Sequence, residues 1–475
     1  MGRVPKEKRR TVSLAQHELF ALLESDRAPT ASAPDLFREV ASFPRFEDIA
    51  NGELFSLSLS NRGANLTHGL HRFAAKYIPR IPGWVLDEFA TKDDVVLDPF
   101  CGSGTTLVEA LTHCNTSIGI DCDPMACMIT NAKTAAIKHE RIQELGQQIR
   151  KAWHGGAQEL HTPMPGVVNF GHWFPESTWG DLQSLFATIS GLTCTAQERD
   201  FLRCIFSSIL RYVSNADDQT QKTYVSGTLK KHPPEVVPTF WKAFSKALTS
   251  LKELEAVRLP NAAAKVIRGD ASDIPLPPSS VDLVITSPPY LDSVDYMYNF
   301  MLEYFWLGPL LGVPDRKTFN HMRRSPTGAK NPLDRNPAHL PRCLADLISE
   351  KDIPASRISA TRTYCASMAQ HFKSAAKVMK KNAHYVLVIG NSKTGKGVLP
   401  IHDSLIRLAA DAGFAFQKAF AYRIRRHYMK FPRAGRGGII TMDWVIVLKN
   451  AGEGGRYPDR LPLPDFTLRA DEVAN

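Results

Sequence analysis

The sequence has no apolar run that approaches the roughly 18 residues of a membrane span. Residues 1–10 are basic, but no apolar stretch follows them, so no signal peptide is visible. The eight cysteines form neither a Cys-x-x-Cys pair nor a disulfide-dense framework, which predicts reduced, mostly structural thiols and no metal site. These absences predict a cytoplasmic protein without a membrane partner.

Acidic residues are in deficit. The 58 lysines and arginines outnumber the 48 aspartates and glutamates, and the formal net charge is +10. Such a balance favours a polyanionic partner, of which nucleic acid is the first candidate. The length of 475 residues allows about three domains of about 150 residues, or one domain with long insertions.

The stretch Val281–Tyr290 is an apolar run that stops in Ser-Pro-Pro-Tyr. Proline lacks an N–H group, so a buried strand has to end at Ser287. The two prolines and the Ser287 hydroxyl make a stiff edge that is rich in hydrogen-bond acceptors, and Tyr290 adds an aromatic face. This combination suits the amino group of a flat heterocycle, although a plain Pro-rich turn has the same sequence.

A second motif, Asp98–Thr106, reads as the end of a strand, a Gly-rich turn and the start of a helix. Glycines let the backbone approach a ligand closely. Asp121 ends the next strand 23 residues after Asp98, which is typical of a carboxylate that binds ribose hydroxyls. The turn lacks Gly-x-Gly-x-x-Gly spacing and a Walker lysine, so a nucleoside cofactor fits better than a dinucleotide or a triphosphate.

Seven strands are expected from the apolar patterns, and helices alternate with most of them. This predicts an α/β fold with a Rossmann-like sheet, a helical insertion and a basic loop region. The expected strands are 95–98, 117–120, 263–269, 281–286, 385–389, 414–424 and 444–448.

The chain divides into seven segments on these patterns. They are a basic amino-terminal arm (1–60), the cofactor motifs (61–138), a helical insertion (139–258), the Ser-Pro-Pro-Tyr segment (259–308), a basic loop region (309–358), the end of the sheet (359–450) and a tail (451–475). The insertion and the loop region are both candidates for DNA contact, and each has the alternative of a solvated polar surface.

The two motifs together resemble the exocyclic-amino DNA methyltransferases, which transfer methyl from S-adenosylmethionine to N4 of cytosine or N6 of adenine. The resemblance rests on Asp98–Thr106, on Thr286–Tyr290 and on Asp121 and Asp270 at strand ends. His71–Pro82 is also similar to a cofactor-pocket motif of that family. The resemblance implies a seven-stranded methyltransferase sheet and duplex DNA as the substrate. It also implies that the protein acts near the nucleoid. A cognate restriction endonuclease is a further candidate partner.

The resemblance also implies roles for single residues. It assigns Phe100, Gly102, Gly104 and Thr105 to the methionine end of the cofactor, Asp121 to its ribose and Asp270 to its adenine. Asp98 and Cys101 complete the cofactor-binding set, and the catalytic set is Ser287, Pro288, Pro289 and Tyr290. The cofactor motifs precede the catalytic motif here, whereas many family members have the reverse order, so either DNA-contact candidate could recognise the target.

An exocyclic amine is a poor nucleophile because its lone pair is delocalised into the ring. Acceptors at Ser287 Oγ and the Pro288 carbonyl would localise that lone pair for direct transfer, while Tyr290 stacks on a flipped base. The chain has no Pro-Cys dipeptide, which excludes methylation of cytosine C5 through a thiol. Serine in place of aspartate at position 287 favours cytosine N4 over adenine N6. An RNA methyltransferase similar to the tRNA guanine-N2 enzymes and a non-catalytic nucleic-acid-binding subunit are the remaining alternatives.

Overall fold

The protein is described from a computed structural model, which covers a defined part of the chain. The described residues are 37–57, 66–74, 76–153, 169–218, 222–228, 230–291, 295–324, 327, 355–390, 392–394, 397–399, 401–423 and 442–452. The chain divides into two compact units after Arg38, and the description below concerns the unit that begins at Glu39. Almost all of the predicted tail and most of the predicted basic loop region lie outside the described residues.

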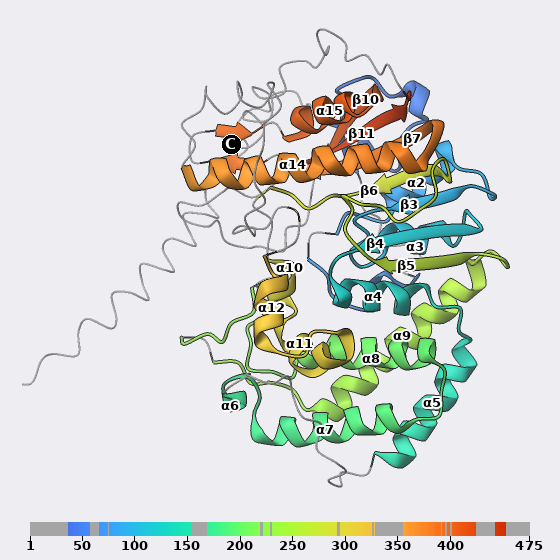
Figure 1. Cartoon of the computed structure of the whole chain (residues 1–475). Helices are drawn as coiled ribbons and strands as arrows, with labels where there is room; N and C mark the ends of the chain where they lie inside the picture. The colour runs from blue at the N-terminus through green and yellow to red at the C-terminus, as the bar shows by residue number, and fades with distance from the viewer. Residues whose placement is uncertain are drawn as a thin grey trace, which may run out of the picture. The chain divides into compact units, whose positions relative to one another are not determined.

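A nine-stranded sheet forms the centre of the unit, in the order β1-β2-β10-β11-β7-β6-β3-β4-β5 (Figure 1). Its strands are β1 (Arg38–Val40), β2 (Leu54–Leu57), β3 (Val95–Asp98), β4 (Thr116–Asp121), β5 (Ala263–Arg268), β6 (Val281–Thr286), β7 (Met379–Gly390), β10 (Phe414–Arg423) and β11 (Met442–Asn450). A separate hairpin joins β8 (Ser392–Thr394) to β9 (Gly397–Leu399).

The middle of the sheet is parallel, and its order reverses at β3. From β3 the chain adds β4 and β5 on one side, and β6 and β7 on the other. β11 is antiparallel to both β7 and β10. Ligands of open α/β sheets bind beyond the carboxyl ends of the strands at such a reversal, which here lies between β3 and β6.

All seven expected strands are present, but the strand count of seven is wrong. β1 and β2 extend the sheet beside β10, where Ala421 and Tyr422 pair in parallel with Leu54 and Phe55. Both strands lie within residues 1–60, so the prediction of a basic arm is also wrong for residues 39–57. All four residues of β2 are buried, and burial of this short apolar run outweighs the basic character of the segment before it. Residues 1–36 lie outside the described part of the chain.

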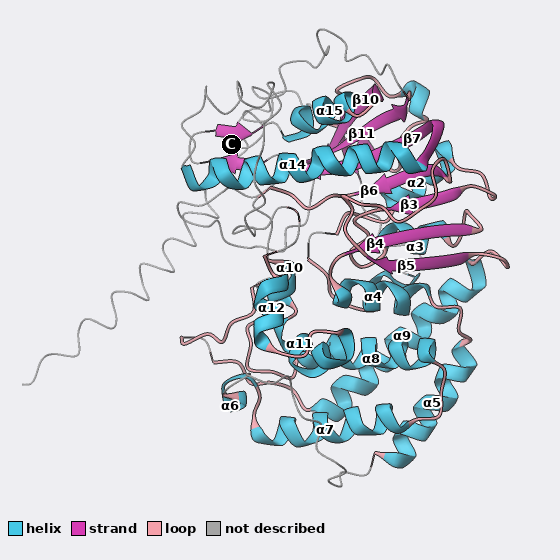
Figure 2. Ribbon diagram, in the orientation of Figure 1, coloured by secondary structure: helices cyan, strands magenta, loops and turns pink. Residues whose placement is uncertain are grey.

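Helices cover both faces of the sheet (Figure 2). In this view α14 (Ala355–Val378) and α15 (Ile401–Asp411) lie in front of the strands, whereas α2 (Arg80–Phe89) and α3 (Thr105–Ala110) lie behind them. Ile81 and Val85 of α2 share a buried core with Ile285 of β6 and Val386 of β7. The parallel pairing of Val96 with Leu283 and of Leu97 with Val284 sets the register of β6 beside β3, and therefore where the two strands end relative to each other.

A second group of helices forms what we call the helical lobe. It lies beside α4 (Pro124–Thr134) in Figure 1. Its helices are α5 (His139–Ala152), α6 (Phe170–Trp173), α7 (Glu176–Gly191), α8 (Ala196–Leu210), α9 (Val236–Val257), α10 (Tyr296–Asn299), α11 (Met301–Leu307) and α12 (Arg316–Met322), with short 3-10 helices at η3 (Leu66–Gly69) and η4 (Gly308–Leu311). A further 3-10 helix, η2 (Phe46–Asp48), precedes β2.

One hydrophobic core joins the two parts of the helical lobe. Leu145 of α5 and Phe206 of α8 come from the predicted insertion, and Trp306 of α11 and Phe319 of α12 come from the segment after Tyr290. The predicted insertion is therefore helical, and the described beginning of the predicted basic loop region is folded onto it. In the described part of the chain, no helix is long and apolar enough to span a membrane.

Candidate active site at the carboxyl edge of the sheet

Asp98 joins the two sequence motifs at the reversal point. Its Oδ1 accepts hydrogen bonds from Thr286 Oγ1 at 2.6 Å and from the Phe100 amide at 3.1 Å, and its Oδ2 accepts one from Thr106 Oγ1 at 2.5 Å. The Tyr77 hydroxyl is bonded in turn to Thr106. Burial raises the pKa of Asp98 to about 6. Asp98 thus binds the end of β6 to the Gly-rich turn.

The Gly-rich turn needs its glycines for both conformation and space. Gly102 and Gly104 have φ angles of 50° and 77°, in the left-handed region that favours glycine. A Cβ at Gly104 would lie 2.6 Å from Thr130 Cγ2 of α4, and Thr130 Oγ1 donates to the Gly102 carbonyl at 2.8 Å. The turn is therefore held tightly between β3 and α4.

Asp121, at the end of β4, faces the same turn. Its Oδ2 accepts the Gly102 amide at 2.9 Å, and its Oδ1 accepts the Asp123 amide at 2.8 Å. Burial and the nearby Asp123 raise the pKa of Asp121 to about 7. A carboxylate has about four lone-pair positions, so Asp121 keeps acceptor capacity for a ligand.

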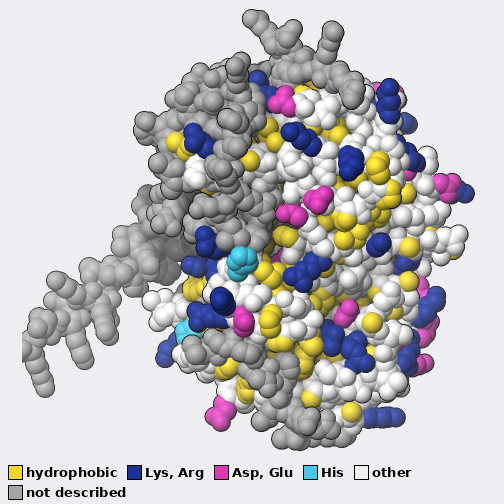
Figure 3. All heavy atoms as spheres, in the orientation of Figure 1, with side chains coloured by type: hydrophobic (Ala, Val, Ile, Leu, Met, Phe, Trp, Pro, Cys, Tyr) yellow, Lys and Arg dark blue, Asp and Glu magenta, His cyan; other side chains and the backbone are white. Residues whose placement is uncertain are grey.

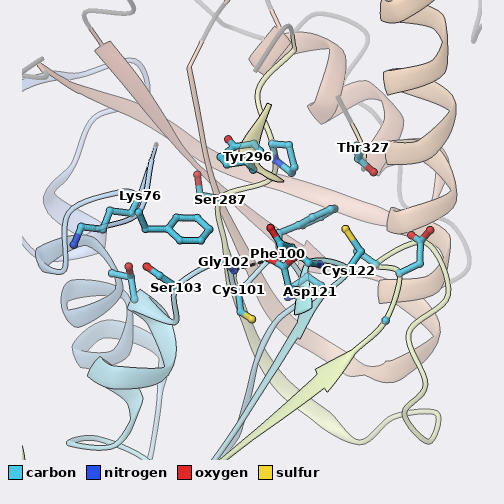
Figure 4. Close-up of a pocket in the computed structure, with 18 of the residues that line it drawn as sticks. Lys76, Phe100, Cys101, Gly102, Ser103, Asp121, Cys122, Ser287, Tyr296 and Thr327 are labelled. Atoms are coloured by element: carbon cyan, nitrogen blue, oxygen red, sulfur yellow. Dashed lines mark hydrogen bonds between the residues drawn. The ribbon is translucent and has the colours of Figure 1, made fainter. Parts of the chain in front are cut away.

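A cavity of about 980 Å³, partly open to solvent, lies at this edge of the sheet. Figure 4 shows Ser287 and Tyr296 above the turn at Gly102, with Lys76 and Ser103 to one side and Asp121 and Cys122 to the other. The cavity is thus bounded by the ends of β3, β4 and β6, by the loop after β5 and by α10.

The cavity brings together most of the predicted site residues and leaves some outside. Eight of the twelve line it, namely Phe100, Cys101, Gly102, Thr105, Asp121, Asp270, Ser287 and Pro289. The other four are not among its lining residues, namely Asp98, Gly104, Pro288 and Tyr290. Asp98 and Gly104 lie behind the lining and shape it. Tyr290 is half-buried, and its hydroxyl donates to Asp443 Oδ1 at 2.8 Å.

Some residues that line the cavity were given no individual role by the resemblance. They are Phe73, Lys76, Tyr77, Pro99, Ser103, Cys122, Asp123, Gly269, Ala271, Tyr296, Met297 and Thr327. The first three lie in His71–Pro82, which the resemblance had marked as a cofactor-pocket motif. Tyr296 stacks on Phe73, with ring centroids 6.2 Å apart and planes 23° apart. Only the fold of α10 back onto the cavity reveals Tyr296, since no local pattern marks it.

Seven of the eight cysteines fall in the described residues, and all seven are free. A cluster of three groups that could hold a metal occurs at the junction of α5 and α9, formed by His139, Glu140 and Glu255. None of the three lines the cavity. Lys138 Nζ lies 2.5 Å from Glu255 Oε1, and His139 Nδ1 lies 2.9 Å from Glu255 Oε2. These ion pairs account for the cluster.

Comparisons with known proteins agree with the two motifs. A family model described as DNA methylase, of the N6/N4 methyltransferase type, matches residues 61–132. The Type II methyltransferase M.MvaI of Kocuria varians is 26% identical over 436 residues, which cover 82% of this chain and 93% of that protein. The chain is therefore similar to the exocyclic-amino DNA methyltransferases, in the cofactor motifs through the family model and over most of its length through M.MvaI.

Two further comparisons extend this result. The Type II methyltransferase M.BsoBI of Geobacillus stearothermophilus is 25% identical over 307 residues, covering 58% of this chain and 59% of that protein. Among solved structures, a putative DNA modification methylase from Thermus thermophilus in complex with S-adenosylmethionine is 15% identical, with a TM-score of 0.22, and covers 42% of this chain and 60% of its own. A score this low adds nothing to the fold established by the sheet order.

The cavity suits S-adenosylmethionine, the cofactor that the resemblance implies. Among the described residues, neither Ser103 Oγ nor Asp123 Oδ2 has a hydrogen-bond partner, although both atoms are buried and both residues line the cavity. Buried polar atoms without partners are rare in native proteins and suggest a ligand. Phe73 and Phe100 supply apolar walls, while Asp121 and Asp270 supply acceptors for hydroxyl and amino groups.

Cofactor affinity is expected to weaken as the pH falls below about 7. The folded pKa of Asp121 is raised to about 7, so the carboxylate that the resemblance assigns to the ribose hydroxyls is lost by protonation below that value. The dissociation constant of S-adenosylmethionine should therefore increase by about tenfold per pH unit below 7. Calorimetric titrations at pH 6, 7 and 8 measure this. Asp121→Asn should bind weakly at every pH, and a pH dependence that survives in this variant would assign it to another group.

Proposed function

We propose that this methyltransferase modifies N4 of cytosine in duplex DNA. The observation that supports the choice of base is Ser287 at the edge of the cavity, where a neutral hydroxyl rather than a carboxylate follows the end of β6. Ser287 is half-buried and faces the same space as Phe100 and Asp121. Serine at this position, rather than aspartate, favours cytosine N4 within the family.

In this proposal the Ser287–Tyr290 lip binds the target amino group. The Asp98–Thr286 hydrogen bond of 2.6 Å fixes the residue directly before Ser287. Ser287 Oγ and the Pro288 carbonyl then accept the two N–H bonds of the amine and direct its lone pair into the cavity. Pro289 stiffens the lip, and Tyr290 adds an aromatic face for the flipped base.

The cofactor side of the cavity would be held by the residues that line it. S-adenosylmethionine supplies a methyl group on an electrophilic sulfonium. Ser103, Gly102 and Thr105 lie at the turn and would bind its methionine end, while Asp121 accepts ribose hydroxyls and Asp270 accepts the adenine amino group. The walls formed by Phe73 and Phe100 exclude water, which strengthens the polar contacts inside.

The product of the reaction tests the proposal. Purified protein should transfer labelled methyl from S-adenosylmethionine to duplex DNA, and chromatography of the digested nucleosides should show 4-methylcytosine. A yield of 6-methyladenine would contradict the cytosine assignment and make this an adenine-N6 enzyme. Label in tRNA alone would contradict the DNA substrate, and absence of any transfer would favour the non-catalytic alternative.

We further propose that the helical lobe contacts the DNA. Figure 3 shows Lys and Arg side chains gathered where α12 lies in Figure 1. On and just after α12, Arg316, Lys317 and Arg324 are exposed, and Thr327 a few residues later lines the cavity. Since α12 packs on the same core as α5 and α8, both predicted DNA-contact regions would act together.

Removal of α12 charges should weaken DNA binding in a salt-dependent way. The double variant Arg316→Ala/Lys317→Ala should raise KM for DNA and reduce the slope of log affinity against log salt concentration by about 2, because each phosphate contact contributes about 0.9. Fluorescence anisotropy from 50 to about 200 mM salt measures this. The exposed lysines of the control Lys92→Ala/Lys265→Ala lie outside the helical lobe, so an equal change there would indicate a nonspecific effect of charge.

The Type II names of the relatives also support a place in a restriction-modification system. We propose a cognate restriction endonuclease that recognises the same DNA sequence as this methyltransferase. Action on chromosomal DNA would place the protein at the nucleoid in the cytoplasm. Mapping methylated positions in the host genome would give the recognition sequence.

A further inference from the structure

Asp443 is a buried carboxylate at the start of β11, and it holds two phenols. Its Oδ1 accepts the Tyr290 hydroxyl at 2.8 Å, and its Oδ2 accepts the Tyr422 hydroxyl at 2.9 Å. The residue is 5% exposed. Among the described residues, the hydrogen bonds from the two phenols are the interactions that stabilise its ionised form.

The antiparallel direction of β11 explains how Asp443 reaches the site. β6 and β7 run parallel, so their last residues lie at the carboxyl edge of the sheet. β11 runs in the opposite direction beside β7, and Asp443 pairs with Gly390 at the end of β7 and with Tyr422 near the end of β10. The first residues of β11 therefore lie at the same edge as the Ser287–Tyr290 lip.

The chemistry of a carboxylate fixes the direction of both hydrogen bonds. An ionised carboxylate only accepts, so both phenols have to donate to Asp443. The Tyr290 oxygen then keeps its lone pairs for another donor. Ser287 lies three residues before Tyr290 and lines the cavity, so a fixed Tyr290 restricts where the Ser287 hydroxyl can lie.

The lip is thus anchored on both sides. Thr286 before it is bonded to Asp98 of β3, and Tyr290 at its end is bonded to Asp443 of β11, two strands away from β6 in the other direction. We propose that Asp443 is a positioning residue, which fixes the Tyr290 end of the lip and thereby the position of Ser287 Oγ, the proposed acceptor for the target amine. This inference rests on the proposed role of the lip in amino-group methylation.

Steady-state kinetics of Asp443→Asn, Tyr290→Phe and the double variant test the inference. Each single variant should lower kcat by about 10- to 100-fold, because a small displacement of a reacting group is enough for such a loss. The dissociation constant of S-adenosylmethionine should stay within about twofold of the wild type, since neither residue lines the cofactor cavity. The double variant should be no slower than Tyr290→Phe, because one hydrogen bond is lost in all three.

Tyr422→Phe is the matched control, since it removes the other phenol and leaves the Tyr290 bond in place. It should keep kcat within about threefold of the wild type. The inference would be overturned if Tyr422→Phe lowered kcat as much as Asp443→Asn does. It would also be overturned if the double variant showed the product of the two single losses in kcat, because Asp443 would then act only through stability. If Asp443→Asn does not fold, Tyr290→Phe decides alone, and a wild-type kcat there overturns it. Failure of wild-type protein to methylate DNA would instead contradict the proposed function.

Discussion

Ser287→Ala is expected to lower kcat by about 10²- to 10³-fold while S-adenosylmethionine still binds with its normal affinity. Ser287 lines the cavity but is not one of the residues that accept the ribose or adenine groups in the proposed arrangement. Loss of its hydroxyl removes one acceptor for the target amine, and this acceptor matters most when the amine becomes a nucleophile. The effect should therefore fall on kcat rather than on cofactor binding.

Single-turnover methyl transfer and calorimetric titration of the cofactor separate these two effects. Ser280→Ala is a matched control because Ser280 lies directly before the other end of β6, where its Oγ donates to the Pro277 carbonyl at 2.7 Å. That variant should retain wild-type kcat. Full turnover in Ser287→Ala would remove Ser287 from the mechanism, and a loss of cofactor binding would reassign it to the cofactor side of the cavity.

The strands, and the carboxyl edge of the sheet where the cofactor motifs lie, could be predicted because each is marked by a local sequence pattern. The apolar run before Thr286 and the strand before Asp98 each carry their own pattern and their own stop signal. Parallel strands then bring these ends together at one edge without further information. For the same reason eight of the twelve predicted site residues line one cavity.

The remaining features depend on contacts between distant parts of the chain. β2 is only four residues long, and its place beside β10 depends on Ala421 and Tyr422, more than 300 positions later. Tyr290 has a clear aromatic signal, but its hydrogen bond to Asp443 spans 153 residues. Tyr296 reaches the cavity because α10 packs with the helical lobe. A single sequence gives no pattern for such pairings.

Asp98→Ala is expected to destabilise the protein, and more at low pH than at high pH. The change leaves Thr286 Oγ1 and the Phe100 amide without their acceptor, and Thr106 Oγ1 is left with the Ile285 carbonyl at 3.3 Å. Buried groups left in this state cost about 1–3 kcal/mol each, although part of this is recovered by relaxation. A net loss of about 3–4 kcal/mol in the free energy of unfolding is expected at pH 5, together with loss of methyl transfer, because β6 would no longer be tied to the Gly-rich turn.

The pH dependence follows from the raised pKa of Asp98. Burial raises it from 3.8 to about 6, so the folded protein binds the Asp98 proton more tightly than the unfolded chain does. The stability that Asp98 contributes is fully present below pH 3.8 and is lost as the pH rises through about 6. The cost of Asp98→Ala should therefore decrease by roughly 1.4 kcal/mol between pH 5 and 8, because about one pH unit separates pH 5 from the folded pKa.

Urea unfolding of wild type and variant at pH 5 and pH 8 measures this difference. Asp87→Ala is the control, since the Asp87 side chain is 70% exposed and pairs only with His113 at the surface. It should change the free energy of unfolding by less than about 0.5 kcal/mol at either pH. An Asp98→Ala cost that is constant with pH would mean that Asp98 stays ionised in the folded protein. Asp98 would then join the two motifs as an ionised carboxylate. The free-energy cost of removing it would depend only on the three groups that donate hydrogen bonds to it.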